Sequence, residues 1–193
     1  YGVPEKGMPY IYLSDATQGV HMRDNLSDPT MVRQLERSTA FPCPISLAAT
    51  FNPSLAYRYA EAVGEECRAG GIEVLLGPGM NIYRNSQNGR NFEYMGEDPL
   101  LASAMVAEYV KGMQSTGTVA CLKHFICNET EFYRRRSNSI VDERALHELY
   151  LPPFKAGIDA GVGYVMTSYN RHGGEWAGQN ADLIRRILRG ELG

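Results

Sequence analysis

Gly117-Thr-Val-Ala-Cys-Leu-Lys-His-Phe125 is the stretch of sequence that decides the fold. Its short, apolar, partly β-branched run predicts a buried strand, and Gly117 ends the helix that precedes it. The strand finishes with Lys123 and His124 side by side. In parallel α/β folds, polar side chains at the carboxyl ends of strands form ligand sites. The stretch therefore predicts a site at this strand end, while a structural ion-pair network stays an open alternative for these two residues taken alone.

The composition is typical of one globular domain. Of the 193 residues, 44% are hydrophobic and 21% are charged, which is enough for a sizeable core. The formal net charge is −3 and no long basic stripe occurs, so we expect no nucleic acid partner. No apolar run reaches the length of about 18 residues that a membrane-spanning helix needs, so we expect no membrane partner.

The sequence predicts no metal and no cofactor. The four cysteines form neither a CxxC pair nor the Cys/His spacing of a zinc site, and small buried hydrophobic side chains are the default interpretation. His147-Glu148 lacks the second histidine that a zinc-binding helix requires. The glycine-rich segment Leu76-Gly-Pro-Gly79 has neither the GxGxxG nor the Walker spacing of a phosphate-binding loop.

Apolar strand segments alternate with helical ones along the chain. Asn52-Pro53 and Asp98-Pro99 are typical helix starts, and Pro152-Pro153 is expected to interrupt a helix that Asp142 caps. The expected strands are 9–14, a short one around Phe41 within 38–47, 73–77, 118–125 and 163–169. This alternation predicts an α/β fold with a parallel sheet, either doubly wound or a parallel (β/α) barrel of which this chain holds roughly the first five of eight units.

Polar residues follow four of these strands, and they distinguish the two architectures. In a barrel, the carboxyl ends of all strands face the same mouth, so the polar side chains that follow them would meet there. Sugar hydroxyls both donate and accept hydrogen bonds, so a mixed set of donors and acceptors suits a polyhydroxylated ligand. The side chains concerned are Asp15, Arg90, Lys123, His124, Tyr169 and Asn170.

Several short motifs, in order, resemble the N-terminal barrel domain of glycoside hydrolase family 3. Ser14-Asp15 with Gly19-Val20 is similar to that family's Ser-Asp-Gly-Pro-x-Gly-Val turn, although Ala16-Thr17 stand where the family has Gly-Pro. The resemblance covers nearly the whole chain, so residues 1–193 are expected to be part of that TIM-like barrel domain. The other motifs are Leu76-Gly-Pro-Gly-Met-Asn-Ile82, Gly89-Arg-Asn-Phe-Glu93, Glu97-Asp-Pro99, Lys123-His-Phe125 with Asn128 and Glu131, Asp142-Glu-Arg144 and Met166-Thr-Ser-Tyr-Asn170.

The resemblance implies a site for the terminal, non-reducing sugar. Asp15 would accept hydrogen bonds from the 4- and 6-hydroxyls, which favours a glucoside over a xyloside. Glu93 and Arg134 would orient Arg90 and Lys123. Trp176 is a candidate for stacking on a neighbouring sugar, with packing as the alternative, and Glu129 is expected to be a surface charge. The implied substrate-binding residues are Asp15, Arg90, Lys123, His124, Met166 and Tyr169, where Met166 has plain packing as an equal alternative.

The resemblance also implies that neither catalytic carboxylate lies within these residues. A retaining β-glucosidase needs a nucleophile and an acid/base, and in this family both lie on segments expected beyond Gly193. The expected partners are thus a β-linked glucoside and the remainder of the same enzyme. A non-catalytic sugar-binding module, a β-xylosidase of the same family and an aldolase-type barrel with a Schiff base on Lys123 remain alternatives. Localisation is open, although enzymes of this family are commonly periplasmic or secreted.

Overall fold

A computed structural model describes residues 2–15, 17–21 and 37–193, and its centre is a four-stranded parallel sheet. The strands are β1 (Leu13–Asp15), β2 (Val74–Leu76), β3 (Val119–Phe125) and β5 (Tyr164–Thr167), and they lie in the order β1-β2-β3-β5. Because the order in the sheet follows the order in the chain, every crossover steps in the same direction. Right-handed crossovers of this kind place all connecting helices on one face. This is the winding of a (β/α) barrel, as the sequence predicted, and not of a doubly wound sheet.

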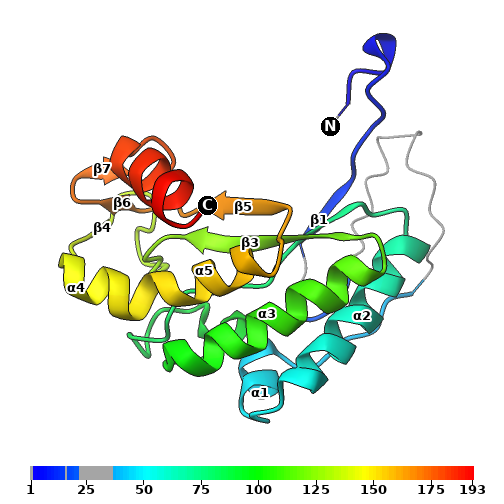
Figure 1. Ribbon diagram of the computed structural model, residues 1–193, viewed down its shortest axis with the longest axis horizontal. Helices are drawn as coiled ribbons and strands as arrows, with labels where there is room; N and C mark the ends of the chain where they lie inside the picture. The colour runs from blue at the N-terminus through cyan, green and yellow to red at the C-terminus, as the bar shows by residue number, and fades with distance from the viewer. Residues whose placement is uncertain (1, 16, 22–36) are drawn as a thin grey trace.

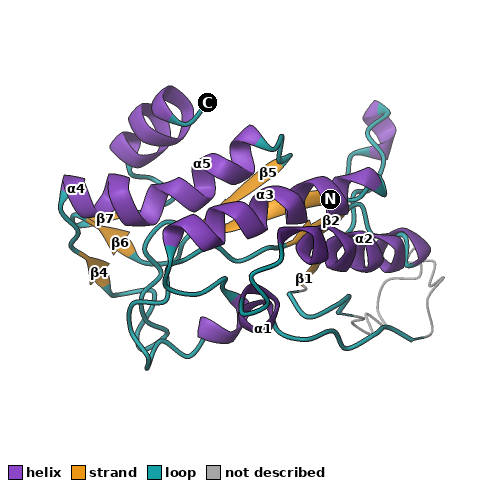
Figure 2. Cartoon of the chain, turned by 60° about the horizontal axis from the view of Figure 1, so that its bottom comes forward, coloured by secondary structure: helices purple, strands orange, loops and turns teal. Residues whose placement is uncertain are grey.

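Three helices connect the strands and lie side by side: α2 (Pro53–Ala69), α3 (Pro99–Ser115) and α5 (Leu151–Asp159), with α3 packed between the other two (Figures 1 and 2). The expected caps are present. The side chain of Asn52 accepts a hydrogen bond from the backbone of Leu55, and that of Asp98 accepts from Leu100 and Leu101. None of the helices in the described ranges is long and apolar enough to cross a lipid bilayer.

The core lies between this helical layer and the sheet. Met105, Tyr109 and Met113 of α3 are fully buried, as are Leu122 of β3 and Phe154 of α5. Glycine also lets neighbouring helices of this layer approach closely: a Cβ atom at Gly112 of α3 would lie 2.1 Å from the carbonyl oxygen of Tyr57 in α2. The packing of α3 on α2 therefore requires glycine at position 112.

The predicted break at Pro152-Pro153 is wrong as a break but marks a real irregularity. Residues 143–159 form one helical run, in which α4 (Glu143–Ala145) passes through the π-helical turn η3 (Leu146–Tyr150) into α5. Proline has no N–H to donate and its ring crowds the preceding turn. The wider π turn before the two prolines accommodates both effects. The last helix, η4 (Asp182–Glu191), is also π-helical, and the side chain of Asn180 accepts a hydrogen bond from the backbone N–H of Leu183 at 3.0 Å.

The predicted strand around Phe41 is wrong, so the described sheet has four parallel strands. Pro42 and Pro44 leave this segment without the backbone donors that a ladder needs. Phe41 instead packs edge-on against Tyr59, with ring centroids 5.2 Å apart, and the helix α1 (Pro44–Ala48) follows. The first strand is also shorter than expected, but it still ends at Asp15.

The remaining elements are short. They lie on the carboxyl side of the parallel sheet or near the amino end of the chain. The long segment between β2 and α3 contains a single turn of 3-10 helix, η2 (Asn91–Glu93). A small second sheet follows β3 and β5 and has the order β4-β6-β7. Its strands are β4 (Asn138–Ser139), β6 (Arg171–His172) and β7 (Glu175–Trp176), and η1 (Pro4–Lys6) lies near the amino end.

Replacing Gly112 with alanine should destabilise the protein by about 2 kcal/mol, because the added methyl group overpacks the α2–α3 contact. Intrinsic helix propensity alone would favour alanine by about 1 kcal/mol, so the sign of the effect tests the packing argument. Urea denaturation measures the free energy of unfolding. As a matched control, Ala104→Gly at an exposed position of the same helix should cost about 1 kcal/mol by propensity alone. A Gly112→Ala variant as stable as the native protein would contradict the argument.

Candidate functional site

A pocket of about 540 Å³ opens at the carboxyl end of the parallel sheet, and residues from widely separated parts of the chain line it. Asp15 comes from the end of β1, Arg90 from the segment after β2, Lys123 from β3 and Tyr169 from the loop after β5. These are four of the six residues that the family resemblance assigned to substrate binding. The described lining also includes Gly19, Val20, His21, Thr39, Phe92, Glu93 and Arg134.

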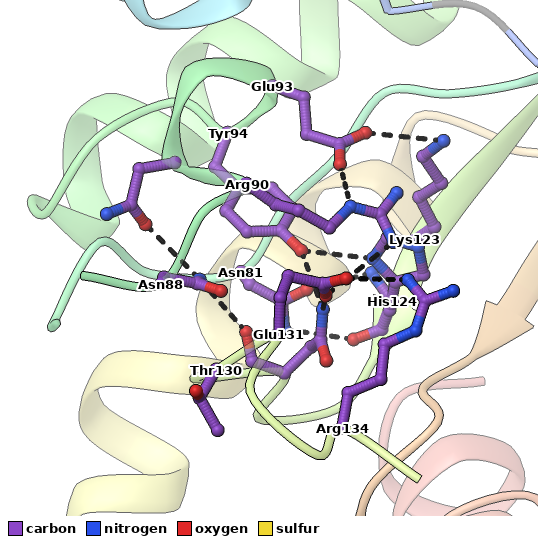
Figure 3. A network of polar contacts seen from close by, with 12 residues as sticks. Asn81, Asn88, Arg90, Glu93, Tyr94, Lys123, His124, Thr130, Glu131 and Arg134 are labelled. Atoms are coloured by element: carbon purple, nitrogen blue, oxygen red, sulfur yellow. Dashed lines mark hydrogen bonds and ion pairs between the residues drawn. The ribbon is translucent and has the colours of Figure 1, made fainter. Parts of the chain in front are cut away.

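Glu93 joins the two cations of the pocket (Figure 3). One carboxylate oxygen accepts a hydrogen bond from Nε of Arg90, and the other lies 3.4 Å from Nζ of Lys123. Glu93 and Lys123 are each only 3% exposed, so this carboxylate is a buried partner for both cations. Burial lowers the pKa of Arg90, but the hydrogen bond and charge of Glu93 outweigh burial and raise this pKa above its usual range. Glu93 thus contacts both cations that it was expected to orient.

A second carboxylate, Glu131, organises the loop after β3. It accepts a hydrogen bond from Arg134 at 2.7 Å and one from Nδ2 of Asn128 at 3.2 Å, and it lies 3.9 Å from Arg90. The guanidinium of Arg134 sits 4.1 Å from the centre of the Tyr169 ring, a cation–π contact. Arg134 therefore reaches Arg90 only through Glu131, and it lines the pocket itself.

His124 is fully buried next to these groups and is not part of the pocket lining. The amide side chain of Asn81 bonds both the N–H and the C=O of its backbone at 3.0 Å, which fixes the strand end. On the ring, Nδ1 lies 3.1 Å from the hydroxyl of Tyr94, and Nε2 has no partner among the residues described. Burial and the charges of Arg90, Lys123 and Arg134 lower its pKa to about 2, so this imidazole is neutral at physiological pH.

The other residues named from the sequence lie apart from the pocket lining. Met166 is half-buried in β5, opposite Lys123 in the strand register. Trp176 is stacked beneath the guanidinium of Arg171, 3.9 Å from its ring centre. The expectation that Glu129 is a surface charge is wrong: it is 8% exposed and forms an ion pair with Arg84 at 2.9 Å. Ala16 of the unusual turn lies outside the described residues.

Sequence reasoning missed two groups of this site, Asn81 and Tyr94. Both act on His124, from 43 and 30 positions away in the chain. Asn81 stands in an apolar segment. An amide side chain in such a segment was the one sequence feature that indicated a buried hydrogen-bonding role. Nothing local in the sequence distinguishes Tyr94 from an ordinary core tyrosine. Among the described residues, no group of His, Cys, Asp and Glu side chains is arranged to hold a metal ion.

The buried neutral imidazole predicts a pH dependence of stability. Native His124 stays neutral down to about pH 2, whereas an unfolded histidine takes up a proton near pH 6.5. Below pH 6.5 the unfolded state therefore binds more protons, and stability falls with falling pH. Between pH 6.5 and about 5, this group alone should contribute a slope of up to about 1.4 kcal/mol per pH unit, and His124→Gln should lack that contribution.

Urea denaturation across this pH range measures the slope. His147→Gln is the control, because the hydrogen bonds of His147 with Glu191 and Glu143 raise its pKa and move its contribution above pH 6.5. Equal slopes for the native protein and His124→Gln would show that the buried imidazole is charged in the native state.

Comparison with known proteins agrees with the sequence motifs. The model of the glycosyl hydrolase family 3 N-terminal domain matches residues 28–193. The chain is 44% identical over 192 residues to the β-glucosidase BoGH3A of Bacteroides ovatus, a match that covers 98% of this chain and 26% of the relative. It is 41% identical over 188 residues to a β-glucosidase of Rhizobium radiobacter, covering 97% of this chain and 22% of that protein.

The solved structures give the same result. β-Glucosidase 3B from Thermotoga neapolitana in complex with glucose superimposes with a TM-score of 0.91 at 42% identity, over 100% of this chain and 27% of that chain. The β-glucosidase DesR from Streptomyces venezuelae in complex with D-glucose gives 0.88 at 34% identity, over 100% of this chain and 23% of that one. The chain thus spans about a quarter of the length of these relatives. By the match of its residues 28–193, the chain belongs to glycosyl hydrolase family 3, as part of the N-terminal domain.

Proposed function

We propose that this chain binds the terminal, non-reducing β-D-glucosyl unit of β-glucosides and serves a retaining β-glucosidase. The observation that carries the proposal is the shared pocket: Asp15, Arg90, Lys123 and Tyr169 come from four parts of the chain and line one hollow. The Thermotoga neapolitana and Streptomyces venezuelae relatives with the same fold are described in complex with glucose. Both are β-glucosidases, which supports the same substrate class here.

The charges around the pocket suit a neutral ligand. Three cations, Arg90, Lys123 and Arg134, are balanced by three carboxylates, Asp15, Glu93 and Glu131. A phosphate or carboxylate ligand would need an excess of positive charge, which this group does not offer. The hydroxyls of a sugar need both donors and acceptors, and this group supplies both.

Each side chain then has a role that follows from its chemistry and from the family resemblance. Asp15 accepts from the 4- and 6-hydroxyls, where charge-assisted hydrogen bonds are strong. Arg90, Lys123 and His124 hold the edge with the 2-, 3- and 4-hydroxyls. Tyr169 lies near the anomeric carbon. Met166, the register partner of Lys123 on β5, is assigned to the same part of the site.

We further propose that the two catalytic carboxylates are supplied by the part of the enzyme that the relatives have beyond this quarter of their length. A retaining mechanism needs two carboxyl groups about 5 Å apart, one nucleophile and one acid/base. Of the two carboxylates in the described pocket lining, Glu93 is the shared ion-pair partner of Arg90 and Lys123, and we assign it the role of holding these two cations. Asp15 is assigned to the far edge of the sugar. The partner of this chain is then the remainder of the same enzyme.

Asp15→Asn should weaken glucose binding about ten- to a hundredfold, because the neutral amide loses a charge-assisted hydrogen bond. Titration calorimetry with glucose and with xylose measures the effect, and the loss should be larger for glucose, which alone carries a 6-hydroxyl. Asp159→Asn, an equal charge change at an exposed site that precedes β5, serves as the control. Native-like glucose affinity in Asp15→Asn would contradict the role, and a preference for xylose would favour a β-xylosidase.

The chain by itself should not hydrolyse p-nitrophenyl β-glucoside, since it is proposed to lack both catalytic carboxylates. An assay of p-nitrophenol release, at a substrate concentration that saturates the glucose site, tests this expectation. Turnover by this chain would place a catalytic carboxylate within these residues and end this part of the proposal.

A further inference from the structure

We infer that Tyr94 is a positioning residue that fixes the tautomer of His124, so that the imidazole presents Nε2–H as a donor and never as an acceptor. The tautomer follows from the hydrogen bonds of the described residues alone. Its consequence for sugar selection rests on the proposed function.

The Glu131 carboxylate fixes the orientation of the Asn128 amide. Glu131 lies between Arg134 at 2.7 Å and Arg90 at 3.9 Å, and a carboxylate held by two guanidinium groups can only accept hydrogen bonds. Asn128 must therefore turn its NH₂ group toward Glu131, with Nδ2 3.2 Å from the carboxylate. The same Nδ2 lies 3.1 Å from the Tyr94 hydroxyl, and Oδ1 has no partner among the described residues.

The Asn128 amide in turn fixes the direction of the Tyr94 hydroxyl. Its oxygen accepts from Asn128, so its own proton needs a different acceptor. Within the described part of the chain, that acceptor is Nδ1 of His124, 3.1 Å away. Nδ1 therefore carries no proton. An imidazole without a proton on Nδ1 is neutral, so its single proton is on Nε2.

The Nε2–H of His124 is the donor that we assign to a ligand hydroxyl. Nε2 is fully buried and makes no hydrogen bond with any residue that the structure describes. A buried donor without a partner is unfavourable, and a ligand hydroxyl that accepts from it removes this cost. The His124 ring lies 5.4 Å from that of Tyr169, which lines the pocket. In the proposed sugar site, Asp15 only accepts hydrogen bonds, and Arg90 and Lys123 only donate them. A fixed donor at His124 adds a further hydrogen bond of defined direction, which a hydroxyl satisfies only by accepting.

Long-range ¹⁵N–¹H correlation spectra of the labelled chain report the tautomer directly. The chain has four histidines, and the signal that disappears in His124→Gln belongs to His124. The expected spectrum has a protonated Nε2 and an unprotonated Nδ1. In Tyr94→Phe this preference should be lost, with a shift toward the Nδ1–H form or a mixture, and glucose affinity should fall about tenfold.

Tyr109→Phe is the matched control. Tyr109 is equally buried, and its hydroxyl has no partner among the described residues, so its removal should leave both the tautomer and the affinity unchanged. Glu131→Gln is a second, more exposed variant: a glutamine can donate, which frees Asn128 to turn and should also weaken the tautomer preference.

Two results would overturn the inference: an Nδ1–H or doubly protonated His124 in the native chain, or an unchanged tautomer in both Tyr94→Phe and Glu131→Gln. A chain with the expected tautomer that does not bind glucose would instead refute the proposed function and leave the tautomer assignment standing. The spectra thus test the tautomer, and the calorimetry tests the proposed function, independently of each other.

Discussion

The site depends on one buried carboxylate that holds two cations. Glu93 is 3% exposed and contacts both Arg90 and Lys123, which approach the pocket from different segments of the chain. Without a negative charge between them, two cations in a poorly solvated site would repel each other and each would lose solvation. Breaking such a pair by removing one member is strongly destabilising, even where the complete pair adds little net stability. Glu93 therefore determines whether the donors of the pocket can be present together.

The winding of the chain makes this meeting possible. Four parallel strands in sequential order bring their carboxyl ends to one side, and the segments that follow β1, β2, β3 and β5 converge there. The helices that cover one face of the sheet pack against each other through close contacts such as that of Gly112 with α2. The amide of Asn81 then fixes the backbone of His124 from both sides. Supports of this kind reduce the reorganisation that ligand binding requires.

The sequence predicts those parts of the molecule that local patterns encode. Asn52-Pro53 and Asp98-Pro99 start helices because an N-cap side chain and a proline act on their own turn. Phe41 failed as a strand because two nearby prolines outweigh an aromatic residue. The polar strand ends were predicted because parallel strands share one edge. Tyr94 and Asn81 were missed because their contacts join distant positions. Glu129 was misjudged because the local sequence does not reveal which carboxylate will be buried against a distant cation.

The balance of charge explains why the imidazole is neutral. Arg90, Lys123 and Arg134 lower the pKa of His124 after burial has already done so, and their three charges are matched by those of Asp15, Glu93 and Glu131. A protonated His124 would add an unmatched charge to a group that has no further carboxylate in reach among the described residues. These three cations, of which Arg90 and Lys123 are the donors of the proposed sugar site, therefore keep the histidine uncharged. A neutral ring can hold its proton on one nitrogen only, and a single proton with a fixed position is what gives a hydrogen bond to a ligand its direction.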